Sequence, residues 1–97
     1  MDYTEADRIL SGVMDRLHKE RKRQGVSLQK LGALSGVEHT TIAKAEKGQR
    51  SPSLLICLRI ADALGLDLED VLKSARKSRR RGSSEGAALR QSQITRL

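Results

Sequence analysis

The 97-residue sequence is nearly free of aromatic side chains, because Tyr3 is its only aromatic residue. It also has one proline, Pro52, one cysteine, Cys57, and no long run of β-branched residues. A core without aromatic rings must be built from aliphatic side chains, and without strand signals this composition favours packed helices. A single cysteine excludes an intramolecular disulfide and a cysteine-based metal cluster, so we interpret Cys57 as a small buried hydrophobic residue. The expected fold class is all-α.

Long apolar runs and catalytic motifs are also missing. No segment approaches the roughly 18 apolar residues that a membrane-spanning helix needs, and the acidic start of the chain does not resemble a secretion signal. The sequence contains no HExxH motif, phosphate-binding loop or Ser/His/Asp arrangement, and a cysteine in a helical core is a poor nucleophile. We therefore expect a cytoplasmic protein that is not an enzyme, has no membrane partner and needs no metal or cofactor.

Positive charge is what the chain has in excess, with 19 Lys and Arg against 12 Asp and Glu and a net charge of +7. Most of this charge belongs to residues 76–97, where Glu85 is the only acid, and a second basic group lies within residues 19–50. Grouped positive charge suits a polyanion such as nucleic acid, although a basic end also serves simply to keep a protein soluble. Residues 76–97 are expected to be a disordered tail until a partner is bound.

The spacing of apolar residues and the positions of capping residues predict five helices. Ser27 is a typical N-cap, and Gly36 and Gly48 are typical stops after a helix. The short turn between the second and third helices has the length found in helix-turn-helix units. On the fourth helix, Leu54 and Leu58 belong to the stripe expected to face the core. The expected helices are residues 4–24, 28–35, 39–47 and 51–64, followed by a fifth helix that Asp67 caps and that carries Leu68, Val71 and Leu72.

Short motifs occur in a fixed order between residues 13 and 72. They are Gly25-Val26-Ser27, Ser35-Gly36-Val37, Thr41-Ile42, Glu46-Lys47-Gly48, Pro52-Ser53-Leu54 and Ala61-Asp62-Ala63-Leu64-Gly65. Their joint order and spacing resemble the phage-repressor-type (Cro/repressor, or Xre) helix-turn-helix family. The resemblance implies a five-helix lambda-repressor-like DNA-binding domain at residues 13–75. Residues 1–12 would extend its first helix, and residues 76–97 would form a flexible basic tail.

The third helix has an apolar side, Ile42 and Ala45, which leaves the other side free for DNA. Carried over from the family, the base-reading positions are His39, Thr40, Ala43 and Lys44. Lysine reaches guanine O6 or N7, threonine offers a methyl group to thymine, and histidine donates to an acceptor. The residues expected to contact phosphates are Gln29, Lys30, Thr41, Gln49, Arg50 and Ser51. The family commonly has Gln where this chain has Leu28, so that phosphate donor is lost here.

Two further sets of residues have expected roles. Arg21 and Glu46 match a family pair that bridges the first helix to the end of the third, either as a buried pair or as a solvated one of little energetic value.

Apolar residues beyond the needs of a minimal five-helix domain are expected to pack together within one chain or across a dimer. They are Ile9, Leu10, Leu55, Ile56, Leu66, Leu68 and Leu72.

The resemblance implies a sequence-specific DNA-binding transcriptional regulator, and a repressor in particular. As a homodimer it would read a pseudo-palindromic operator in double-stranded DNA, with half-sites about 34 Å apart. The alternative is an antitoxin-like interaction module that binds a toxin as its protein partner and represses its own operon. The basic tail would either wrap the DNA backbone or only improve solubility.

Overall fold

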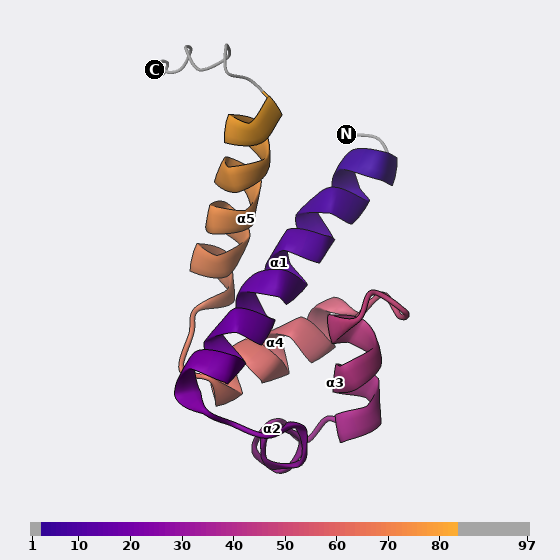
Figure 1. Cartoon of the computed structure of the whole chain (residues 1–97), viewed down its shortest axis with the longest axis vertical. Helices are drawn as coiled ribbons and strands as arrows, with labels where there is room; N and C mark the ends of the chain where they lie inside the picture. Colours follow the sequence, from indigo (N-terminus) through magenta and orange to yellow (C-terminus); the bar gives the residue numbers. More distant parts are fainter. Residues whose placement is uncertain (1–2, 84–97) are drawn as a thin grey trace.

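The computed structural model describes residues 3–83, with side chains for residues 4–77. Within that part the chain is all-helical and has five helices in the order that the sequence predicts, and Figure 1 shows their arrangement. The all-α expectation is therefore confirmed. The helices are α1 (Tyr3–Gln24), α2 (Leu28–Ser35), α3 (His39–Glu46), α4 (Leu54–Ala63) and α5 (Leu68–Ser83).

The core lies where the helices meet, and α5 contributes Val71 and Ala75 to it. Each of α1, α2, α3 and α4 contributes one of the largest fully buried side chains, which are Leu17, Leu31, Ile42 and Ile60. Burying one such side chain contributes about 1.5–3 kcal/mol, so these contacts hold the short helices α2 and α3 in place. Cys57 is also buried, as its apolar surroundings in the sequence predicted.

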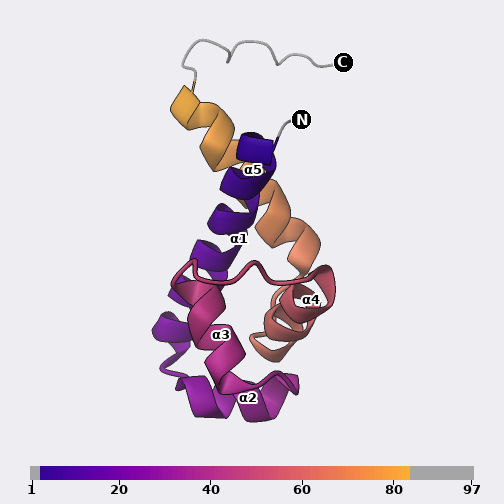
Figure 2. The ribbon, with the colours of Figure 1, turned by 90° about the vertical axis from the view of Figure 1, so that its right-hand side faces the viewer.

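Helices α1 and α5 pack side by side and extend together beyond the other three helices (Figures 1 and 2). Their close approach depends on Gly12, because a Cβ atom at this position would lie 3.1 Å from the Cβ atom of Ala75. Ile9, Val13 and Leu17 on α1 are all buried, so the apolar stripe of this helix is used along most of its length.

Local side-chain chemistry explains where α2 and α4 begin and where α2 ends. The hydroxyl of Ser27 accepts a hydrogen bond from the backbone N–H of Lys30 (3.0 Å), and Ser53 caps α4 in the same way. Gly36 ends α2 in the left-handed conformation with φ 76°, which a residue without Cβ adopts at little cost.

Two predicted boundaries are wrong. Pro52 and Ser51 precede α4 instead of forming its first turn, because Ser53 is the residue that caps the helix. Helix α5 continues to Ser83, into the segment predicted to be a disordered tail from residue 76 onward, because arginine and lysine favour helices and positive charge suits a helix C-terminus. The rest of the predicted disordered tail, residues 84–97, lies outside the described residues.

The expected orientation of two leucines is also wrong. Leu54 and Leu58 are 68% and 46% exposed, because α4 fills the core with a stripe made of Cys57, Ile60, Ala61 and Leu64.

The apolar residues that we expected to pack within the chain or across a dimer fall into two groups. Ile9 is buried, and four others pack partly buried against the chain's own core: Leu10, Ile56, Leu66 and Leu68. These residues pack against the core of their own chain. Leu55 and Leu72 remain 57% and 39% exposed. None of the described helices is long and apolar enough to cross a membrane.

Candidate nucleic-acid interface

Helices α2 and α3 form a two-helix unit joined by Gly36, Val37 and Glu38. Ser35 stabilises the turn, since its buried hydroxyl accepts a hydrogen bond from the N–H of Val37 at 3.2 Å. In Figure 2, α3 lies on the side of the molecule that faces the viewer, with α2 beneath it. The unit therefore presents α3 at the surface while α1 and α2 pack against its other side.

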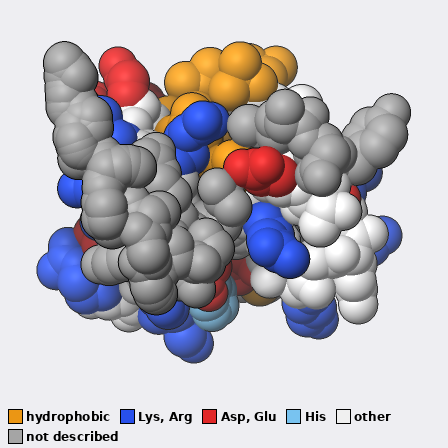
Figure 3. Space-filling view, turned by 90° about the horizontal axis from the view of Figure 1, so that it is seen from above, with side chains coloured by type: hydrophobic (Ala, Val, Ile, Leu, Met, Phe, Trp, Pro, Cys, Tyr) orange, Lys and Arg blue, Asp and Glu red, His pale blue; other side chains and the backbone are white. Residues whose placement is uncertain are grey.

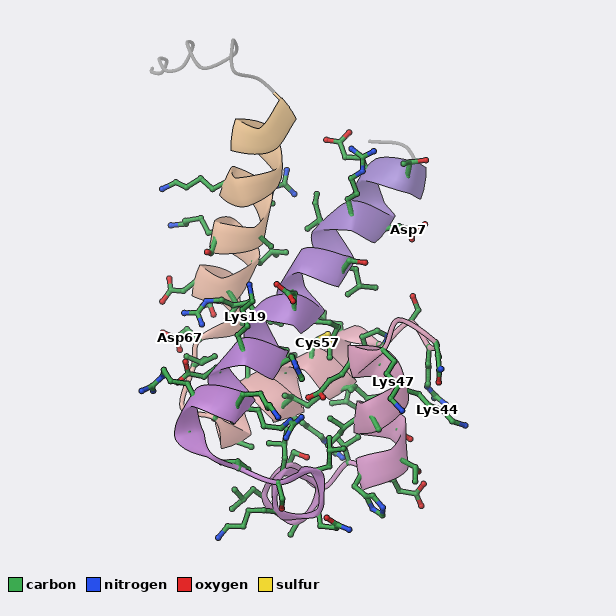
Figure 4. The ribbon with its side chains drawn as sticks, viewed as in Figure 1. Asp7, Lys19, Lys44, Lys47, Cys57 and Asp67 are labelled. Atoms are coloured by element: carbon green, nitrogen blue, oxygen red, sulfur yellow. The ribbon has the colours of Figure 1, made fainter. Side chains whose placement is uncertain are left out.

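Helix α3 has one face in the core and one in solvent. Ile42 and Ala45 are buried, whereas His39, Thr40 and Lys44 are exposed. Lys44 points away from the rest of the molecule in Figure 4. The structure thus brings three of the expected base-reading residues to one accessible helix face. Two other predicted contacts on this helix, Ala43 and Thr41, are half-buried.

Apart from Thr41, the residues expected to contact phosphates lie at two ends of the exposed face of α3. Gln29 and Lys30 are in the first turn of α2, while three others are in the loop between α3 and α4. All of these are exposed, and the loop members are Gln49, Arg50 and Ser51. Leu28, which stands where the family has a glutamine, packs against the core. The backbone N–H groups at the start of α2 remain there as donors for a phosphate.

Two hollows adjoin this surface. The first, of about 320 Å³, lies at the turn between α2 and α3 and brings Gln29 close to His39. The second, of about 600 Å³, separates α1 from the loop after α3 and is lined by Arg50 on one side and by Asp7 and Asp15 on the other. The carboxylates of α1 repel phosphates, so only the outer side of this loop suits a DNA backbone.

Arg21 ties α1 to the end of α3. Its Nε and Nη2 donate to Glu46 Oε2 (2.8 Å) and Oε1 (2.9 Å), and its Nη1 donates to the carbonyl of Val26 (2.8 Å). Each side chain of the pair is only 9% exposed. Of the two forms considered for this pair, the structure has the buried one. The contact fixes the C-terminal end of α3 against α1 and so sets how α3 is presented.

His18 is part of the same cluster, a role that was not predicted from the sequence. Its Nδ1 lies 2.9 Å from Oε1 of Glu46. Its sequence signal was the spacing from Arg21: residues three apart on one helix lie on the same face, so His18 lies beside Arg21 and can reach the same partner. Burial by itself raises the pKa of Glu46, but the hydrogen bonds with Arg21 and His18 outweigh it and the pKa is lowered.

A second ionic cluster, around Glu20, was also missed. Arg23 and Gln24 donate hydrogen bonds to its carboxylate, and these bonds lower its pKa to about 2. Gln24 also donates to the carbonyl of Leu64 at 2.8 Å, which connects the end of α1 to the end of α4. No cluster of His, Cys, Asp or Glu that could hold a metal ion occurs among residues 3–83.

Comparisons with known proteins agree with this geometry. The family model HTH_3, described as helix-turn-helix, matches residues 17–71. The chain is 47% identical over 51 residues to the uncharacterized HTH-type transcriptional regulator YgzD of Bacillus subtilis (strain 168), an alignment that covers 53% of this chain and 77% of that protein. It is 41% identical over 56 residues to an uncharacterized HTH-type transcriptional regulator of Methanothermobacter thermautotrophicus, which covers 57% and 81% of the two chains.

A third similar protein is an uncharacterized HTH-type transcriptional regulator of Haemophilus influenzae. It is 41% identical over 51 residues, which is 53% of this chain and 52% of that protein. No solved structure matches the chain significantly.

Proposed function

Because the chain belongs to the helix-turn-helix family HTH_3, as its sequence motifs predicted, we propose that it represses transcription by binding a pseudo-palindromic DNA operator as a homodimer. The observation that carries this proposal is the division of α3 into a core face and an exposed face with His39, Thr40 and Lys44. A helix held from behind and exposed in front fits the major groove of B-DNA. Its relatives are named as transcriptional regulators.

We assign sequence recognition and backbone contact to different residues. Lys44 would donate to guanine and Thr40 would contact a thymine methyl group, with His39 near the start of the helix. Lys30 and Arg50, on either side of α3, would neutralise phosphates and fix the register without reading sequence. Residues 13–75 would form the DNA-binding unit, and the family match at 17–71 lies inside that range.

Selection of bound sites from random duplex DNA tests this function. The full chain is used at about 150 mM salt, because moderate salt weakens the sequence-independent phosphate contribution. We expect an enriched pseudo-palindrome. The Lys44→Ala variant should lose preference at one base pair of each half-site, whereas Lys73→Ala, which removes an exposed lysine of α5, should select the same site as the parent.

Three outcomes would contradict the proposal. Binding without an enriched motif would show that the chain does not read sequence. Unchanged selection by Lys44→Ala would remove that residue from base recognition. A single unrepeated half-site would exclude the two-fold arrangement.

A further inference from the structure

Helix α3 begins after a residue that does not cap it. Glu38 occupies the N-cap position, and its side chain makes no capping hydrogen bond. By contrast, Ser27 and Ser53 cap α2 and α4 through their hydroxyl groups, and small polar residues of this kind are the ones that favour the position. A glutamate at the start of α3 thus forgoes a stabilising contact. Departures of this kind from a local rule are expected at functional positions.

The carboxylate of Glu38 is available to a ligand. Its side chain is exposed, and among residues 4–77 it has no hydrogen-bond or ion-pair partner. Glu38 also lines the hollow of about 320 Å³ at the turn between α2 and α3, together with Gln29 and His39. The N-terminal residues of a recognition helix are the ones that contact base edges. Glu38 therefore lies at the end of α3 where a side chain can reach a base.

A negative charge at this place is a cost if the surface binds only phosphates. Glu38 is the only Asp or Glu between residues 21 and 45. At the end of the arm formed by α1 and α5, by contrast, acidic and basic side chains lie next to each other (Figure 3). A carboxylate near a DNA backbone weakens binding to every sequence, because like charges repel. A contact that only some sequences offer can offset this cost and give specificity.

Cytosine offers the group that a carboxylate accepts. Its N4 amino group donates into the major groove, whereas guanine and thymine present acceptors there, and adenine places an acceptor beside its donor. We propose that Glu38 reads a cytosine of the operator by accepting a hydrogen bond from N4, and that its charge disfavours other bases at that position. The inference rests on the proposed function and adds a base to what α3 recognises.

Site selection with the full chain at about 150 mM salt compares the parent with Glu38→Gln. The parent should select a C·G pair in each half-site, at a position other than the one that Lys44→Ala loses. Glu38→Gln should lose this preference and favour adenine, whose N6 and N7 suit an amide. Glu69→Gln makes the same chemical change at an exposed position of α5, which Figure 1 places away from α3, and should select the site of the parent.

Fluorescence anisotropy on operators that carry each of the four base pairs at this position measures the size of the effect. Replacing the C·G pair should weaken binding of the parent by about tenfold and binding of Glu38→Gln much less. Glu38→Ser separates base recognition from stability, because its hydroxyl can cap α3 as Ser27 caps α2. This variant should unfold at a higher temperature by circular dichroism and still lose the preference for cytosine.

Two results would overturn the inference, and they differ in what they say about the proposed function. A motif that changes with Lys44→Ala but keeps every preference with Glu38→Gln removes Glu38 from base recognition and leaves the proposed function standing. A parent that selects no motif overturns both.

Discussion

At the scale of single residues, Arg21 connects three parts of the chain through one planar side chain. It donates to both oxygens of Glu46 on α3 and to the carbonyl of Val26 in the loop before α2. A guanidinium has donors in the fixed fork that a carboxylate accepts, and lysine does not. With both side chains 9% exposed, the loss of one partner leaves the other as an uncompensated buried charge.

Arg21→Ala should therefore destabilise the fold before it affects DNA contacts. We expect the free energy of unfolding to fall by roughly 3–5 kcal/mol, the usual effect of breaking a buried ion pair. Urea denaturation followed by circular dichroism measures the change. Lys22→Ala, at the exposed neighbouring position, is the control and should unfold like the parent. An Arg21→Ala variant with the midpoint of the parent would show that the pair contributes little to stability.

Stability should also depend on pH in the acid range. The pKa of Glu20 is lowered to about 2, and that of Glu46 is lowered as well. A carboxylate with a lower pKa in the folded state adds stability above its unfolded pKa, and this contribution is lost as the pH falls through the folded value. The free energy of unfolding should thus be constant above the ordinary value of 4.5 and decrease from there toward pH 2.

Urea unfolding at a series of pH values measures this dependence. Glu46→Gln removes one of the two titrating groups and should make the decrease shallower. Glu38→Gln, at an exposed position in the turn, should retain the slope of the parent. Equal slopes for the parent and Glu46→Gln would exclude Glu46 as a source of the acid sensitivity.

At the scale of the helices, local chemistry was sufficient to predict where most helices begin and end. It was not sufficient to predict which side chains of one helix contact another helix. Ser27 and Gly36 act through hydrogen bonds and backbone angles a few residues away, so the limits of α2 were readable. The contact between His18 and Glu46 joins residues 28 apart in sequence and depends on how α1 crosses α3. The exposure of Leu58 likewise depends on which stripe of α4 the other helices cover, and an apolar helix leaves that choice open.

The packing of α1 against α5 offers a test at this scale. Gly12→Leu places a large side chain where even a Cβ atom would lie 3.1 Å from Ala75. We expect a loss of about 1–3 kcal/mol in the free energy of unfolding, the usual cost of overpacking. Ser11→Leu, at the adjacent exposed position, is the control and should leave stability nearly unchanged. A Gly12→Leu variant as stable as Ser11→Leu would mean that α1 and α5 can move apart to accommodate the side chain without lowering the free energy of unfolding.

At the scale of the whole molecule, the basic side chains form two separate groups, one around α3 and one on α5. Lys30, Lys44 and Arg50 surround the exposed face of α3, whereas α5 carries Arg76 and Lys77 along the arm that it forms with α1. In Figure 1 this arm extends away from α2 and α3. Net charge and its grouping were visible in the sequence, but the direction of α5 was not, because it follows from the packing of α5 along α1.

This arrangement predicts which basic residues control the salt dependence of DNA binding. Each phosphate that a protein neutralises steepens the log-log dependence of affinity on salt by about 0.9. Arg50→Gln should thus lower the slope by about 0.9 for each bound copy. The double variant Arg76→Gln, Lys77→Gln removes more charge but should leave the slope unchanged. Fluorescence anisotropy on the selected operator measures both slopes. A lower slope for the double variant would mean that α5 reaches the DNA backbone.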